Sequence, residues 1–178
     1  MAAIDYYFTA LRVTHFIAGI TWIGLLYWFN FVNTPTFKEL DAPTRNILIP
    51  RLVKRTLLWF RWSAVVTVVA GWLYFFSWWA ANNYFTLATG IAPPSGTWDV
   101  SILAGGLLGT FMLLNVWGII WLNQKKVIAA VEGVAQGKPA PPEMPVWGKR
   151  ALIASRFNTI LSWPMLFFMA TASHLPLV

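Results

Sequence analysis

Four long apolar stretches divide the chain. They cover residues 6–32, 57–80, 100–122 and 152–175, and charged residues are rare within each of them. A helix needs about 20 apolar residues to cross the hydrocarbon core of a bilayer, and each stretch is long enough. Because a bilayer offers no partner to unpaired backbone groups, each stretch is predicted to be helical. The pattern predicts an all-α membrane protein, with four transmembrane helices bundled into a single domain over residues 1–178.

The composition agrees with this class. Hydrophobic residues make up 58% of the chain and charged residues 11%, whereas about 25% of the residues of a soluble domain are charged. The chain has no cysteine, which excludes disulfides, thiolate-bound iron–sulfur clusters and the Cys-x-x-Cys-His attachment of c-type haem. The N-terminus lacks a basic region and a small-residue cleavage site, so we expect the first helix to be retained rather than removed as a signal peptide.

The distribution of positive charge predicts the orientation in the membrane. Ten of the 13 lysines and arginines lie in the first and third connections, residues 33–56 and 123–151, and none lies in the second connection, residues 81–99. By the positive-inside rule the two basic connections face the cytoplasm, which places both termini and the second connection outside. Topology and attraction to anionic headgroups explain the net charge of +7, so no nucleic-acid partner is expected.

Polar groups within the apolar stretches are costly and are therefore candidate functional residues. His15 lies about ten residues into the first helix, in its predicted outer half. Arg12 is one turn before it, and Gly19 and Trp22 follow on the same helix face. A histidine beside a helical glycine leaves space for a flat ring system, and Arg12 is placed to pair with an acidic group near the interface. This arrangement predicts a haem b site, with His15 on the iron and the propionates toward Arg12.

The second axial ligand of the haem iron is predicted to be His174, which ends the fourth helix on the same side of the membrane. Small residues precede it and would admit a porphyrin. Two other interpretations stay open: His15 is hydrogen-bonded to a neighbouring helix, and His174 is an interfacial histidine in water.

A second group of polar residues falls toward the cytoplasmic side: Arg61, Asn115, Arg156 and Asn158. Two arginines and two amides suit a planar, anionic, hydrogen-bonding small molecule. The alternative is structural, with snorkelling arginines and interhelical hydrogen bonds that hold the bundle together. Gly105 and Gly109 form a small-xxx-small pair that predicts a helix-packing seam.

Four segments carry a resemblance to a known family: "HFIAGITWIGLLYWFNFVNTP", "LLWFRWSAVVTVVAGWLY", "NVWGIIWLNQKKVI" and "ASRFNTILSWPMLFFMATASH". They resemble the membrane domain of the bacterial membrane-bound, cytochrome c-linked urate oxidase family, also called urate hydroxylase. The resemblance implies a bacterial inner-membrane protein that passes electrons from urate oxidation to a c-type haem domain outside, and an outer C-terminus. With no cysteine, the chain is expected to be a short form without the C-terminal cytochrome c domain.

Three functions are compatible with these observations. The first is a haem b-binding electron-transfer protein or subunit that works with a c-type cytochrome or a larger membrane redox complex. The second is a cofactor-free accessory subunit of a respiratory or photosynthetic membrane complex. The third is the membrane component of a urate or purine oxidase that works with a separate cytochrome c.

Overall fold

The computed structural model describes residues 2–89 and 97–172, with side chains placed over 4–82 and 100–172, and every element in this part of the chain is helical. The elements in chain order are α1 (Ala2–Tyr27), η1 (Trp28–Asn33), α2 (Thr34–Glu39), α3 (Ala42–Leu48), η2 (Ile49–Val53), α4 (Lys54–Thr89), α5 (Thr97–Asn115), η3 (Val116–Trp121), α6 (Leu122–Val134) and α7 (Met144–Thr171). The three η segments are π-helical, with a wider turn than an α-helix.

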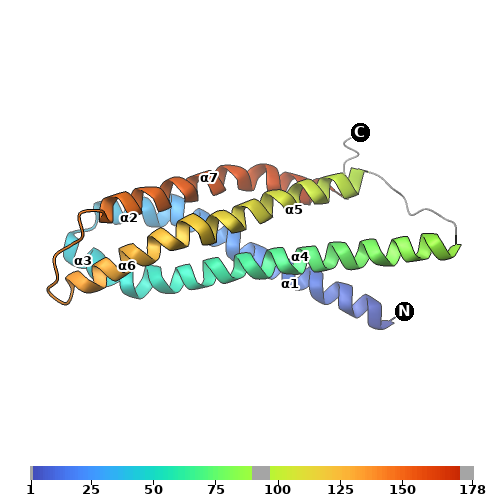
Figure 1. Cartoon of the computed structure of the whole chain (residues 1–178), viewed down its shortest axis with the longest axis horizontal. Coiled ribbons are helices and arrows are strands. Elements are labelled where there is room, and N and C mark those ends of the chain that lie inside the picture. Colours follow the sequence, from blue (N-terminus) through green and yellow to red (C-terminus); the bar gives the residue numbers. More distant parts are fainter. Residues whose placement is uncertain (1, 90–96, 173–178) are drawn as a thin grey trace.

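These elements join into four helical runs that are long and apolar enough to cross a membrane: Ile4–Glu39, Ala42–Asn82, Val100–Val134 and Met144–Thr171. The runs lie side by side in an elongated bundle, and the first residues of α1 and the last residues of α7 lie at the same end of it (Figure 1). Large apolar side chains such as Ile20, Leu114 and Ile160 point outward and are mostly exposed, as expected for helices that face lipid. The predicted all-helical membrane fold is confirmed.

Each of the four helical runs extends beyond its predicted apolar stretch toward the first or third connection. Most of the first connection, residues 33–56, is helical, because its prolines stand where a helix tolerates them. Pro43 occupies the first turn of α3, where the missing N–H would have no partner anyway. Pro35 follows the π-helical segment η1 within the continuous run Ile4–Glu39. Asp41 caps α3 by accepting a hydrogen bond from the Thr44 N–H. The Thr44 side-chain hydroxyl, more than this N–H, lowers the pKa of the Asp41 carboxyl.

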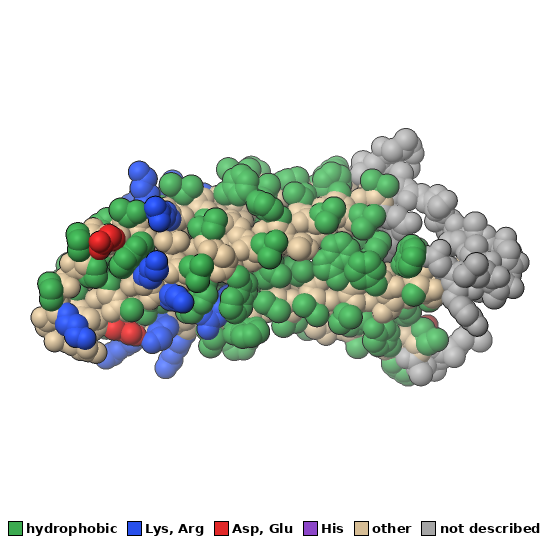
Figure 2. Space-filling model, viewed as in Figure 1, with side chains coloured by type: hydrophobic (Ala, Val, Ile, Leu, Met, Phe, Trp, Pro, Cys, Tyr) green, Lys and Arg blue, Asp and Glu red, His purple; other side chains and the backbone are tan. Residues whose placement is uncertain are grey.

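One end of the bundle carries most of the positive charge. The helical extensions bring together the basic residues Lys38, Arg45, Arg51, Lys54, Arg55, Lys125, Lys126, Lys149 and Arg150, and we call this the basic end. Figure 2 shows the lysines and arginines gathered at the end where α2, α3 and the start of α7 lie, with apolar side chains over the middle. An exposed ion pair, Lys54 to Glu132 at 2.7 Å, joins α4 to α6 there.

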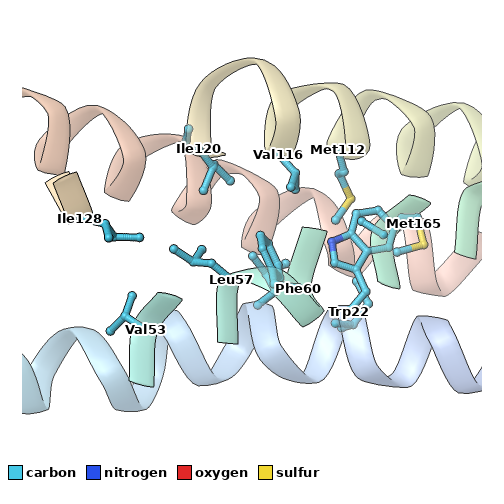
Figure 3. Close-up of a cluster of buried hydrophobic side chains, with 13 residues drawn as sticks. Trp22, Val53, Leu57, Phe60, Met112, Val116, Ile120, Ile128 and Met165 are labelled. Atoms are coloured by element: carbon cyan, nitrogen blue, oxygen red, sulfur yellow. The ribbon is translucent and has the colours of Figure 1, made fainter. Parts of the chain in front are cut away.

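The bundle is built from two helix pairs. α1 packs along α4, and the continuous run of α5, η3 and α6 packs along α7, with less extensive contact between the pairs. A cluster of buried apolar side chains fills the space where the four runs meet. Figure 3 shows Trp22, Phe60, Met112, Val116 and Met165 in this cluster. Trp22, Phe60 and Met112 are at most 1% exposed, so they set the spacing between the pairs.

Of the two glycines predicted to form a helix-packing seam on α5, one lies against a neighbouring helix. A Cβ at Gly105 would lie 3.0 to 3.3 Å from the Met169 side chain of α7, whereas a Cβ at Gly109 would meet nothing within 4 Å. Close approach of α5 and α7 therefore depends on Gly105.

We expect Gly105→Val to destabilise the bundle by about 1–3 kcal/mol, because the added side chain must displace Met169. Gly109→Val is the matched control, since it adds the same groups to the same helix in open space. Unfolding of both variants in mixed micelles, titrated with a denaturing detergent, measures the difference. Equal midpoints for the two variants would show that Gly105 does not set the α5–α7 distance.

Candidate functional site

His15 is held on α1 by the backbone of α4. Its Nδ1 lies 2.7 Å from the carbonyl oxygen of Thr67, and the imidazole is half-buried. Because a carbonyl oxygen only accepts, Nδ1 carries the proton and donates it, and Nε2 keeps a free lone pair. A hydrogen bond from one ring nitrogen to a backbone carbonyl is the usual way in which a metal-ligating histidine is oriented.

A glycine on α4 makes room for the His15 ring. A Cβ at Gly71 would lie 2.9 Å from both Cε1 and Nδ1 of His15, a distance at which something must move. Gly71 therefore allows the imidazole to lie directly against the α4 backbone. On the same side of α1, a Cβ at Gly19 would lie 3.5 Å from Cγ2 of Thr67, so α4 fills the space beside Gly19.

The other two residues of the predicted haem group lie in different surroundings. Arg12 is exposed, and its guanidinium carbon is 6.0 Å from the centre of the Tyr74 ring. Trp22 is buried in the apolar cluster beside Met112 and Met165 (Figure 3), and its indole Nε1 has no hydrogen-bond partner. Trp22 therefore belongs to the core of the bundle, whereas Arg12 stays available on the surface.

His174 lies outside the described residues, so its pairing with His15 stays a prediction. Over residues 2–89 and 97–172, no group of three or more histidines, cysteines, aspartates or glutamates is assembled that would hold a metal ion. A haem iron needs no such group, because the porphyrin supplies four of its ligands.

Two of the four predicted inner residues meet in the core. Asn115 of α5 donates through Nδ2 to Asn158 Oδ1 at 2.7 Å and to the Ala154 carbonyl at 3.0 Å. Asn158 of α7 is fully buried and donates in turn to the Met112 carbonyl at 3.0 Å. Both amides bind the facing helix rather than an open site. For these two residues, the contacts therefore agree with the interpretation in which interhelical hydrogen bonds hold the bundle together.

The two arginines lie apart from this amide pair. Arg61 of α4 is half-buried, with its guanidinium carbon 3.7 Å from the centre of the Trp121 ring and 5.7 Å from that of Trp117. Trp117 also donates from Nε1 to the Arg61 carbonyl at 3.4 Å. Arg156 is exposed on α7. Arg61 is thus stacked against two tryptophans at the α4–η3 contact.

A cavity of about 280 Å³ lies at the basic end, among the helices of all four runs. Its polar lining residues are Asn33, Thr34, Lys38, Arg45, Gln124 and Ser155, and none of Arg61, Asn115, Arg156 and Asn158 lines it. The sequence patterns did not single out Asn33, Thr34, Lys38, Arg45 or Gln124 as site residues. The available signal was Phe37 beside Lys38 in the first connection.

We expect the Asn115–Asn158 pair to couple energetically. Asn115→Ala and Asn158→Ala each remove hydrogen bonds between α5 and α7, so a double-mutant cycle should give a coupling free energy of about 0.5–1.5 kcal/mol. Detergent-induced unfolding of the two single variants and the double variant measures it. Asn123→Ala is the control, because Asn123 donates only to Ile119 of its own helix; strictly additive effects would exclude the coupling.

Comparison with known proteins identifies one family. Residues 95–178 match the family described as Urate oxidase N-terminal. No curated protein and no solved structure matches the chain. The matched residues include α5, η3, α6 and α7, which form one of the two helix pairs and contribute Asn115 and Asn158. The predicted resemblance is therefore confirmed over this part of the chain, where residues 95–178 match the Urate oxidase N-terminal family.

Proposed function

We propose that this protein is an integral membrane protein that binds haem b through His15 and relays electrons to a c-type cytochrome or a larger membrane redox complex. The observation that supports it is the 2.7 Å hydrogen bond from His15 Nδ1 to the Thr67 carbonyl. In the neutral imidazole this bond leaves Nε2 as the nitrogen with a lone pair, and a neutral imidazole nitrogen is what binds haem iron.

The residues around His15 are compatible with this ligand role. Gly71 lets the ring lie against α4, so the imidazole is immobilised before any ligand binds. Arg12, one turn away and exposed, is available for a propionate. His174 is the proposed second axial ligand. Haem b, when bound, supplies a one-electron redox centre; the chain supplies the oriented imidazole, the positive charge of Arg12 and an apolar surround that excludes water.

The proposed direction of electron flow follows from charge. The basic end carries the lysines and arginines that the positive-inside rule assigns to the cytoplasm. The opposite end, where α1 begins and α7 ends (Figure 1), then faces the periplasm and an outer acceptor. His15 lies in the half of the run Ile4–Glu39 that is nearer that end.

The haem proposal is tested by a reduced-minus-oxidised spectrum of protein purified after haem-replete expression. We expect b-type Soret and α bands in the wild type and their loss in His15→Ala. His15→Asn keeps an N–H donor near Thr67 but removes the iron-binding nitrogen, so it should also lose the bands while folding normally. Thr14→Ala, an exposed neighbour, is the control and should keep them. A wild type without b-type bands, or a His15→Asn variant that retains them, would overturn the proposal.

Gly71→Ala tests the positioning of His15 separately. The new methyl group would lie 2.9 Å from the ring, so the imidazole must move and its bond to Thr67 must weaken. We expect a lowered haem content and a shifted midpoint potential, with the expression level unchanged. Gly24→Ala on α1, where a Cβ meets nothing within 4 Å, should leave both properties as in the wild type. A Gly71→Ala protein with wild-type haem content and potential contradicts this role for Gly71.

The family match favours a second candidate function, a membrane component of urate or purine oxidation that works with a separate cytochrome c. Membranes that contain the protein should then reduce added cytochrome c when urate is supplied. Reduction no faster than in membranes without the protein would rule out this candidate and leave the first intact.

The proposed orientation has its own test, because the chain has no cysteine and a single introduced thiol reports one position. Glu143→Cys lies between α6 and α7 at the basic end, and Tyr6→Cys lies near the start of α1. In intact cells with a permeabilised outer membrane, we expect an impermeant maleimide to label Tyr6→Cys and not Glu143→Cys. The reverse labelling pattern would show that the protein has the opposite topology.

A further inference from the structure

Three π-helical segments from three different helical runs converge on the basic-end cavity. η1 contributes Phe29 and Asn33 to its lining, η2 contributes Ile49 and Val53, and η3 contributes Ile120. Well under 1% of residues in soluble globular proteins are π-helical, and such turns occur frequently at functional sites. Their meeting at one cavity indicates that the cavity is a built feature of the fold.

The backbone N–H groups at the ends of two of the widened turns, η1 and η2, are hydrogen-bonded. The N–H groups of Thr34 and Lys54 each donate to a carbonyl five residues earlier, those of Phe29 and Ile49. Thr34 Oγ1 also donates to the Phe29 carbonyl at 2.7 Å. Pro35 follows η1 and Pro50 lies within η2, and a proline ring demands extra room in the turn before it. η3 contains no proline, so its widened turn has no such backbone cause.

The cavity is apolar inside and positively charged at its rim. Phe29 and Phe60 lie edge to face in its lining, with ring centres 5.6 Å apart, and Phe37 is a third ring in the lining. Lys38 and Arg45 are both exposed, and no carboxylate is among the residues that line the cavity. This distribution favours a ligand with an apolar, ring-shaped body and a negative charge.

One residue of the lining, Asn33, carries a polar atom without a partner. Oδ1 of Asn33 is buried and has no hydrogen-bond partner. A buried acceptor without a partner is costly and is uncommon in folded proteins. A ligand that carries an N–H or O–H group beside its ring would satisfy it.

We propose that the basic-end cavity binds a small ring-bearing organic acid. Its anionic group pairs with Lys38 and Arg45, its ring packs against Phe29, Phe37 and Phe60, and its N–H or O–H group donates to Asn33. The volume of about 280 Å³ is at the small end of the range for ligand pockets. The site is separate from His15, which does not line the cavity, so it does not rest on the proposed haem function.

The probe is indole-2-carboxylate, which has a ring, a carboxylate and an N–H donor; naphthalene-2-carboxylate lacks the donor. Each is titrated calorimetrically into the full chain in phosphatidylcholine nanodiscs, with empty nanodiscs as the blank for partitioning into lipid. We expect protein-dependent binding of both, with the indole acid bound more tightly. Asn33→Leu should remove the difference between the two acids. No protein-dependent binding at millimolar concentration would overturn the proposal.

Charge variants locate the site. Lys38→Gln and Arg45→Gln should each weaken binding by about tenfold, the loss of one charge-assisted hydrogen bond. Arg51→Gln is the matched control, because Arg51 is exposed in η2 but does not line the cavity. Equal weakening by Arg45→Gln and Arg51→Gln would mean attraction to general surface charge and would overturn the proposal.

A filling variant tests the cavity without removing charge. Gly148 lines the cavity, and a Cβ there meets nothing within 4 Å, so Gly148→Leu should fold and abolish binding. Gly24→Leu adds the same side chain to open space on α1 and should bind normally. Normal binding by a folded Gly148→Leu protein, judged by its elution profile and unfolding midpoint, places the acid elsewhere and overturns the proposal.

An anionic lipid also combines a negative charge with an apolar body. A second set of titrations therefore distinguishes a small acid from a lipid as the occupant of the cavity. The titrations are repeated in nanodiscs of phosphatidylglycerol. A small acid that enters from water should bind with nearly the same affinity after correction for surface potential. Competitive loss of binding in phosphatidylglycerol, absent in phosphatidylcholine, would show that the lipid is the occupant and would overturn the assignment to a small acid.

Discussion

Hydrogen bonds from α7 hold the bundle together, both within its own helix pair and across to the other pair. Lipid tails are as apolar as leucine, so burial of apolar side chains alone gives little reason for membrane helices to associate. Asn158 binds α5 through Asn115. Ser155 accepts from Asn30 at 2.8 Å, and Ser162, which donates to Thr159, accepts from the Tyr27 hydroxyl at 2.9 Å. α7 is thereby tied to α5 on one side and to the first helical run on the other.

Ser155, Asn158 and Ser162 lie near the middle of α7, and the two ends of the bundle beyond them differ in what they can do. Toward the basic end, all four runs meet around a cavity with charged residues at its rim. Toward the other end, α1 packs chiefly along α4, and Val13, Phe16 and Ile17 around His15 are at least half exposed. His15 is thus fixed by one helix and open toward the surface of the bundle, where a flat apolar group has access.

Hydropathy predicted the four helices because burial in lipid is a property of each segment alone. Residues 33–56 were treated as a connection between apolar stretches, so their helicity was not predicted. Pro43 stands in a first turn and Pro50 in a widened turn, where a helix tolerates them. Asn115 and Asn158 were both singled out, but their pairing depends on how α5 packs on α7. The acceptor of His15 is a backbone carbonyl, which no side-chain pattern reveals, and Gly71 matters only through its position opposite that ring.

The length of the helical runs has a consequence for access. The runs Ile4–Glu39 and Val100–Val134 contain 36 and 35 residues, which at 1.5 Å per residue is over 50 Å, against about 30 Å for the hydrocarbon core of a bilayer. In the proposed orientation, the surplus of about 20 Å at the basic end, with its lysines and arginines, would extend into the headgroup layer and the water beyond it. A water-soluble molecule would then reach the basic-end cavity from the cytoplasm.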